Sequence, residues 1–353
     1  METMVESTVQ LERFGYLPVE NVQALSSKKL DNIPSRYIRP EIESDVVSAD
    51  ESLQIPVINV SKLDHEDEQK KLHFACKDWG FFQIINHGVA DEVIEKMKTD
   101  AQEFFDLPLE EKMVCAQVPG HIEGYGQVFV VSENQKLDWS DMIFLISQPA
   151  HLRDMRFWPT KPPSFRETME KYTTELHKLM IQLMKLIANN LGTDPEMLLS
   201  LFENEIQSIK MNYYPPCAEA SKVLGASPHS DATALTLLLH ANEVEGLQIK
   251  RDQKWVPVKP IPGAFTVNVG DVLEILSNGE YKSIEHRAVV DREKERLSIA
   301  SFHNQKMGTQ IGPLPDLVKT NKALYRSIPV EEFRKMKLTS KQDGKFMIRK
   351  MKL

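Results

Sequence analysis

The chain has 353 residues, of which 41% are hydrophobic, and a formal net charge of −8 at pH 7. This apolar content is ordinary for a globular protein and excludes disordered and fibrous classes. No apolar run reaches the roughly 18 residues of a membrane span, and the acidic balance argues against binding nucleic acid through its phosphates.

Three cysteines, Cys76, Cys115 and Cys217, are spread along the chain without the close pair that is typical of a zinc site or redox motif. We interpret them as reduced thiols. The first ten residues are polar and acidic, which indicates an unsecreted protein. We therefore expect a cytoplasmic monomer that binds neither nucleic acid nor membrane.

The first 200 residues or so are predicted to be mostly helical. Residues 1–53 have few periodic apolar positions, which indicates an arm laid over the body. Strands are expected at 55–60, directly after Trp79 and at 138–145. The expected helices are 63–79, 91–105, 107–112 and a long one at 166–190, in which apolar residues recur every three or four positions.

After Glu205 the sequence changes to short runs of strand-forming residues separated by Pro and Gly. Such strands favour a sandwich or jelly roll over a parallel sheet that alternates with helices. We expect an N-terminal arm (1–53), a helical N-terminal domain (54–204), a jelly-roll domain (205–310) and a helical C-terminal tail (311–353). The expected elements are strands at 207–214, 236–240, 247–250, 255–258, 265–269, 281–288 and 296–302, and a closing helix at 330–336.

A candidate metal site lies in this second half. His229 and Asp231 are two residues apart, so on a strand edge their side chains project to the same side. His286 comes much later in the chain and could join them only through the fold. Two imidazoles and one carboxylate form a triad that leaves positions open on Fe(II) for oxygen and a bidentate co-substrate.

A candidate anion site lies on two other expected strands. An Arg on an inward strand face is a buried cation, which needs an anion, and a dicarboxylate could bind it in a bidentate manner. The residues alone also allow Arg296 to form a surface ion pair. Alternation predicts that Lys210, Asn212 and Tyr214 share one face of the first strand, and that Arg296, Ser298, Ala300 and Phe302 share one face of the second.

Taken in order, the motifs resemble the plant 2-oxoglutarate- and Fe(II)-dependent dioxygenases over nearly the whole chain. Residues 243–250 are similar to the specialised-metabolism branch that contains morphinan-alkaloid and methoxyflavone O-demethylases. The motifs are Trp79-Gly80-Phe81-Phe82, Asn86-His87-Gly88-Val89, Asn212-Tyr213-Tyr214-Pro215-Pro216-Cys217, His229-Ser230-Asp231, Asn268-Val269-Gly270-Asp271, His286 and Arg296-Leu297-Ser298.

The resemblance implies a mixed α/β fold with a double-stranded β-helix (jelly-roll) core, a helical N-terminal domain and a C-terminal helix. It also implies Fe(II), 2-oxoglutarate and O2 as cofactors, with ascorbate as a stimulant. Ser230 stands where the family often has Thr, and its side chain should point away from the metal. The implied site residues are His229, Asp231 and His286 for iron, Arg296, Ser298, Tyr214 and Asn212 for 2-oxoglutarate, and Phe302, Lys210, Tyr125, Phe129 and Phe144 for the substrate pocket.

The implied reaction oxidises a C–H bond of a small aromatic plant metabolite, an alkaloid or a flavonoid, by O-demethylation or hydroxylation, and releases succinate and CO2. Two alternatives remain open. An ascorbate-dependent oxidase of the ethylene-forming kind shares the triad and the Arg/Ser pair. A non-catalytic jelly-roll binding module would have no need for that pair.

Overall fold

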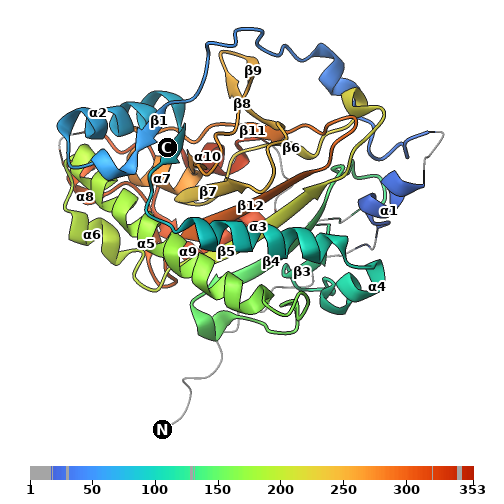
Figure 1. Cartoon of the computed structure of the whole chain (residues 1–353). Helices are drawn as coiled ribbons and strands as arrows, with labels where there is room; N and C mark the ends of the chain where they lie inside the picture. Colours follow the sequence, from blue (N-terminus) through green and yellow to red (C-terminus); the bar gives the residue numbers. More distant parts are fainter. Residues whose placement is uncertain are drawn as a thin grey trace.

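The computed structural model describes residues 17, 19–28, 32–127, 130, 132–319, 321–339 and 344–353. The described part of the chain folds around one large sheet and one smaller sheet, with helices packed against the large one. Figure 1 shows α3 (Asp91–Asp106) and α5 (Phe165–Leu191) side by side across the face of the large sheet.

The large sheet has eight strands in the order β1-β2-β10-β7-β12-β5-β4-β3. Its strands pair in antiparallel fashion except for β1 and β2, which are parallel. The bounds are β1 Val57–Asn59, β2 Phe81–Ile85, β3 Gly124–Gly126, β4 Asp141–Gln148, β5 Ile206–Tyr214, β7 Leu235–His240, β10 Phe265–Val269 and β12 Arg296–Asn304.

The smaller sheet has the order β6-β11-β8-β9, and a two-stranded sheet pairs β13 with β14. Together with the large sheet, the smaller sheet forms the jelly-roll core, which confirms the expected fold class. The bounds are β6 Ala226–His229, β8 Leu247–Arg251, β9 Lys254–Pro257, β11 His286–Ala288, β13 Gln310–Ile311 and β14 Ile328–Pro329.

Alternation along the central strands separates the core from the interior of the jelly roll. In β7, Leu235, Leu237 and Leu239 pack into the main hydrophobic core, whereas Thr236 and Leu238 face the other way, into a cavity. β5 and β12 follow the same rule. The polar faces of these strands therefore lie between the two sheets, where the site is built.

The helices follow from local sequence signals. The apolar stripe of α5 is buried, and the helix ends at Gly192, whose φ of +68° is the left-handed conformation that favours glycine at a helix C-terminus. Asp194 caps the next helix by accepting a hydrogen bond of 3.0 Å from the backbone of Glu196. The remaining helices are α1 Val22–Ser27, α2 Glu66–Phe74, α4 Leu109–Lys112, α6 Pro195–Ser200, α7 Asp271–Leu276, α8 Pro315–Val318, α9 Val330–Thr339 and α10 Phe346–Met351.

Two sequence-based expectations need correction. The strand expected at 281–288 is shorter in the structure, where β11 covers only His286–Ala288. The chain first leaves α7 and turns before it pairs at His286. α7 itself was missed, since it has only six residues and all of them are buried, so the sequence lacks the alternation of an apolar and an exposed polar face that indicates a helix. Within the described part of the chain, no helix has the length and apolar character that a membrane crossing requires.

Residues on both sides of position 205 contribute strands to the large sheet, since β1 to β4 precede this position and the other four strands follow it. The four-part division of the chain therefore describes sequence segments, and its boundaries remain a prediction. The structure describes the arm at residue 17, at residues 19–28, which include α1, and from residue 32 onward. In Figure 1 this later part passes beside β8 and β9.

Candidate active site

Two histidines and one aspartate meet between the sheets. His229 on β6 and His286 on β11 are directly opposite each other in the pairing register, and their ring centroids are 4.3 Å apart. Asp231 follows β6, and its Oδ1 lies 3.7 Å from Nε2 of His229 and 3.8 Å from Nε2 of His286. One ligand atom from each of the three residues lies within 4.8 Å of the others.

Hydrogen bonds orient both imidazoles. Nδ1 of His229 is 2.7 Å from the carbonyl oxygen of Ser227, and Nδ1 of His286 is 3.1 Å from that of Ile284. A carbonyl only accepts, so each Nδ1 carries a proton, and each Nε2 is the ring atom that faces Asp231. Burial, with a further contribution from His286, lowers the pKa of His229 to about 4, which keeps this ring neutral near pH 7.

Asp231 is held with one oxygen free. Thr236 Oγ1 donates to Oδ2 at 2.7 Å and Asn268 Nδ2 donates to the same atom at 2.9 Å, so Oδ1 remains for a metal. Burial alone would raise the pKa of this carboxyl. The two imidazoles and the two hydrogen bonds outweigh burial and hold the pKa at about 2.

These donors fit an Fe(II) ion. Two imidazoles and an ionised carboxylate, with Nε2, Nε2 and Oδ1 converging on one point, form the 2-His-1-carboxylate face of non-haem iron oxygenases. Since this triad sits inside a jelly roll, fold and site define an oxygenase of that class.

A small cavity of about 70 Å³ adjoins the triad, and Arg296 lines it. The guanidinium is buried and 5.0 Å from the ring centroid of Tyr214, and its Nε has no hydrogen-bond partner. No carboxylate among the described residues forms an ion pair with it. A buried cation of this kind needs an anion, and one end of 2-oxoglutarate would provide it.

Two glycines make room for this arrangement. A Cβ on Gly225 would lie 2.5 Å from the ring of Tyr214, and a Cβ on Gly246 would lie 2.8 Å from Cδ of Arg296. Both distances are too short for a real contact. Sequence reasoning missed these two residues, because a close approach between distant segments leaves no local pattern.

A larger cavity of about 190 Å³ lies on the other side of the triad. It shares Lys210, His229, Asp231 and Phe302 with the small cavity, so the two spaces meet at the metal site. Register explains this continuity, because Arg296 pairs with Tyr214 and Phe302 with Ser208 along the same two strands. Side chains along β5 and β12 therefore line the small cavity near Arg296 and, further along the same strands, the larger cavity.

The C-terminal helices close this larger cavity. Val330, Phe333, Arg334 and Lys337 line it from α9, and Phe346 and Met347 line it from α10. None of these residues was predicted from the sequence to line the site. A signal was present in α9, where the four positions recur at spacings of three and four and so share one helix face.

The structure brings most, but not all, of the expected residues together. Tyr125 was expected at the substrate pocket but lines neither cavity. It is buried beside Phe104, where a large aromatic residue fills the core under α3. Phe129 lies outside the described residues. The expected residues that line one cavity or both are the three of the metal site, the four predicted to bind 2-oxoglutarate (Arg296, Ser298, Tyr214 and Asn212), and Phe302, Lys210 and Phe144.

Ser230, between the two ligands of the triad, donates its hydroxyl hydrogen toward Oδ2 of Asp271 at 3.2 Å or the carbonyl oxygen of Gly344 at 3.4 Å. These partners are not metal-site residues, which agrees with the expectation that the side chain points away from the metal.

Comparison with known proteins agrees with the class defined by the site. Residues 55–161 match the family model of the non-haem dioxygenase in morphine synthesis N-terminal domain, and residues 205–305 match that of the 2OG-Fe(II) oxygenase superfamily. The chain belongs to the 2OG-Fe(II) oxygenase superfamily, among the plant 2-oxoglutarate-dependent dioxygenases.

Named relatives cover nearly the full chain. S-norcoclaurine synthase 1 of Coptis japonica is 56% identical, over 96% of this chain and 97% of that protein. Oxoglutarate-dependent flavonoid 7-O-demethylase 1 of Ocimum basilicum is 46% identical (96% and 92%), and codeine O-demethylase of Papaver somniferum is 40% identical (99% and 100%). The crystal structure of JOX2 in complex with 2OG, Fe and JA superimposes with a TM-score of 0.89 at 38% identity, over 96% of this chain and 98% of that one.

The protein is therefore an enzyme that uses Fe(II) and 2-oxoglutarate. A non-catalytic binding module is excluded, and 2-oxoglutarate is favoured over the ascorbate-dependent oxidase.

Proposed function

We propose that this enzyme oxidises a C–H bond of a methoxylated or hydroxylated aromatic plant metabolite, by O-demethylation or hydroxylation, and releases succinate and CO2. One observation carries the proposal. A small cavity with a buried cation that has no carboxylate partner among the described residues and a larger, mainly apolar cavity meet at the metal triad. This arrangement supports a charged co-substrate on one side of the metal and an apolar substrate on the other.

In the proposed roles, His229, Asp231 and His286 hold the iron, and Arg296 holds the far carboxylate of 2-oxoglutarate, with Ser298, Tyr214 and Asn212 beside it. Together the bound iron and 2-oxoglutarate supply the activation of O2 that allows an unactivated C–H bond to be oxidised. The chain itself keeps the imidazoles in one tautomer, excludes water and positions the substrate carbon. Phe302, Lys210 and Phe144 provide the positioning surface.

The charge of Lys210 is the feature that favours flavonoid over alkaloid substrates. It is half-buried and lines both cavities, and its ammonium group has no hydrogen bond or ion pair with any residue that the structure describes. Burial lowers the pKa of its ammonium group, whereas Asp138 and Asp231 act to raise it. An ammonium here would donate to a phenol or methoxy oxygen and repel a protonated amine. We therefore place flavonoid-type substrates ahead of cationic alkaloids.

A substrate panel tests the proposal. Purified enzyme with Fe(II) and 2-oxoglutarate is given methoxylated flavones and methoxylated alkaloids, and succinate and formaldehyde are measured together. We expect succinate release coupled to one of the two groups, with formaldehyde if the oxidised carbon is a methoxy carbon. A product formed without succinate would contradict the proposal and favour synthase chemistry, the activity in the name of the relative from Coptis japonica.

Replacing Lys210 with Met tests the choice of substrate class. For an oxygen-rich substrate we expect kcat/KM to fall roughly 10- to 100-fold, mainly through KM, because one charge-assisted hydrogen bond of roughly 1.5–3 kcal/mol is lost. The KM for 2-oxoglutarate should stay near the wild-type value, and Lys210→Arg should retain part of the binding. A similar loss for cationic amine substrates would rule out the selective role of Lys210.

A further inference from the structure

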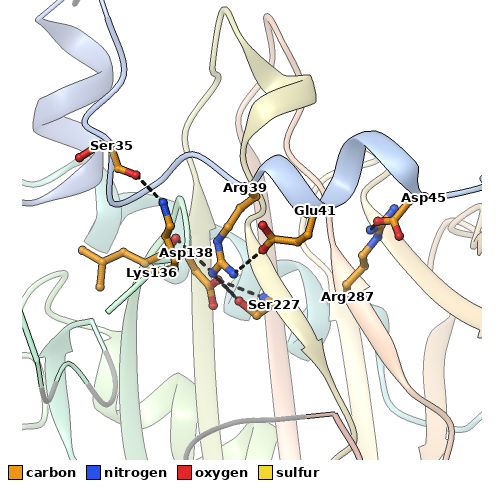
Figure 2. Close-up of polar contacts among 9 residues, drawn as sticks. Ser35, Arg39, Glu41, Asp45, Lys136, Asp138, Ser227 and Arg287 are labelled. Atoms are coloured by element: carbon orange, nitrogen blue, oxygen red, sulfur yellow. Dashed lines mark hydrogen bonds and ion pairs between the residues drawn. The ribbon is translucent and has the colours of Figure 1, made fainter. Parts of the chain in front are cut away.

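Residues 39–48 of the N-terminal arm cross the smaller sheet and contact three of its four strands. The arm meets β6 through Arg39 and β11 through Asp45. It meets β9 through two backbone hydrogen bonds of 2.8 Å, in which the N–H of Trp255 donates to Val46 and the carbonyl oxygen of Trp255 accepts from Ser48. Figure 2 shows the first two contacts, with Arg39 reaching Asp138 and Ser227 and with Asp45 beside Arg287. Two of the three strands, β6 and β11, carry the two histidines of the metal site.

The first contact leads directly to His229. Arg39 is buried, and its guanidinium donates to Oγ of Ser227 at 2.6 Å and to Oδ1 of Asp138 at 2.9 Å. The same carboxylate oxygen accepts from the backbone N–H of Ser227 at 3.1 Å. Ser227 is thus fixed at both its side chain and its amide, and its carbonyl oxygen is the acceptor for Nδ1 of His229.

The second contact lies one residue from His286. Consecutive strand residues project to opposite faces, so Arg287 points away from the metal side. Its guanidinium forms an ion pair with Asp45, donates to Oε1 of Gln248 at 2.8 Å and lies 4.1 Å from the ring centroid of Trp255. The arm therefore holds both histidine strands from the side opposite the metal.

β6 needs such support more than β11 and β8, which have a strand neighbour on both sides. It is a four-residue strand at the sheet edge. Among the described residues β11 is its one strand neighbour, with a single further bridge between His229 and Gly344, and its register with β11 shifts between His286 and Ala288. An edge strand with few ladder hydrogen bonds and an irregular register specifies the position of its side chains weakly. A contact that fixes Ser227 therefore fixes the ring of His229 as well.

We propose that Arg39 and Asp45 are positioning residues for the iron, because the arm locks β6 and β11 at the spacing that lets His229 and His286 bind one ion. The inference rests on the proposed roles of these two histidines. Residues that hydrogen-bond a metal ligand typically contribute 10- to 100-fold to metal affinity. Arg39 acts through Ser227 and Asp45 through Arg287, so we expect effects at the lower end of this range. An arm that only covered the sheet would contribute to stability and leave the affinity unchanged.

Metal affinity of the full-length protein tests the inference without relying on turnover. Co(II), which is stable in air, is titrated calorimetrically into wild type, Arg39→Met and Asp45→Asn, and thermal unfolding of the metal-free proteins is recorded in parallel. We expect both variants to bind Co(II) about tenfold or more weakly than wild type. Wild-type affinity in both variants, whatever their unfolding temperatures, would overturn the proposal.

Arg36 provides the matched control on the same arm. Its guanidinium donates to the backbone carbonyl groups of Gln135 at 3.2 Å and Ser132 at 2.9 Å, and neither of these residues belongs to a histidine strand. Arg36→Met should lower the unfolding temperature in a similar way but keep Co(II) affinity within about twofold of wild type. If it weakened Co(II) binding as much as Arg39→Met, a general loss of packing would explain both.

Ser227→Ala keeps the test decisive if Arg39→Met does not fold. This change removes the hydroxyl that Arg39 holds but retains the carbonyl that orients His229. A several-fold loss of Co(II) affinity is expected, and wild-type affinity would contradict the proposal. If the wild-type protein itself bound no Co(II), the metal-site assignment would fail first, so the two failures can be distinguished.

Discussion

Replacing Asp231 with Ala should abolish turnover. We expect a loss of about 1,000-fold or more, because a bound metal ion supplies several kcal/mol of the catalytic effect and each 1.36 kcal/mol is a factor of ten in rate. Asp231 is the one carboxylate of the triad, and the two imidazoles that remain offer no negative charge to hold Fe(II). The measurement is succinate release at saturating 2-oxoglutarate, together with metal content after dialysis.

Asp271→Asn is the control for this variant. Asp271 is also buried near the triad, but its carboxylate accepts hydrogen bonds from Ser230 and Ser283 and is not part of the metal group. It should therefore retain metal after dialysis. Near-normal turnover of the Asp231→Ala enzyme would remove Asp231 from the site.

Replacing Arg296 with Ala should raise the KM for 2-oxoglutarate by roughly 100-fold, because truncating one partner of a buried, hydrogen-bonded charge pair costs about 2–5 kcal/mol. The KM for the organic substrate should change far less, since the larger cavity does not include Arg296. Arg296→Lys should be intermediate, because an ammonium group cannot make the bidentate contact of a guanidinium. Initial rates with either substrate varied give both constants.

The stability of the ligand-free protein separates a binding role for Arg296 from a structural one. Its guanidinium is buried with an unpartnered Nε and no acidic partner among the described residues, so its burial costs free energy in the absence of an anion. We therefore expect ligand-free Arg296→Ala to unfold at the wild-type temperature or above it. Equal effects on the two KM values, with a lower unfolding temperature, would contradict the anchor role.

The part of the site that could be predicted from sequence depends on strand periodicity and on the spacing of a few chemically distinctive residues. Two-residue spacing placed His229 and Asp231 on one side, and alternation placed Arg296 and Ser298 on one face of β12. The structure has these residues at the two cavities. These features are local, so a single sequence contains them.

Other features depend on contacts between distant segments and left no local signal. Tyr125 and Phe144 are both aromatic residues on strands, yet Phe144 lines the larger cavity and Tyr125 fills the core. Composition does not distinguish these environments. The contact between Arg39 and Ser227 joins residues 188 positions apart, and Gly246 is constrained by the later Arg296 and by the carbonyl oxygen of Val289. Cytoplasmic location, a monomeric state and stimulation by ascorbate remain predictions.

The central claim is that the triad and Arg296 together form a binding site for Fe(II) and 2-oxoglutarate. Anaerobic addition of both to the purified protein tests this directly, since chelation of the iron by 2-oxoglutarate gives a weak visible charge-transfer band. We expect the band in wild type and its loss in His286→Ala, because His286 provides one of the three ligand atoms of the group. Absence of the band in intact, iron-loaded wild type, or its survival in His286→Ala, would contradict the assignment of the site.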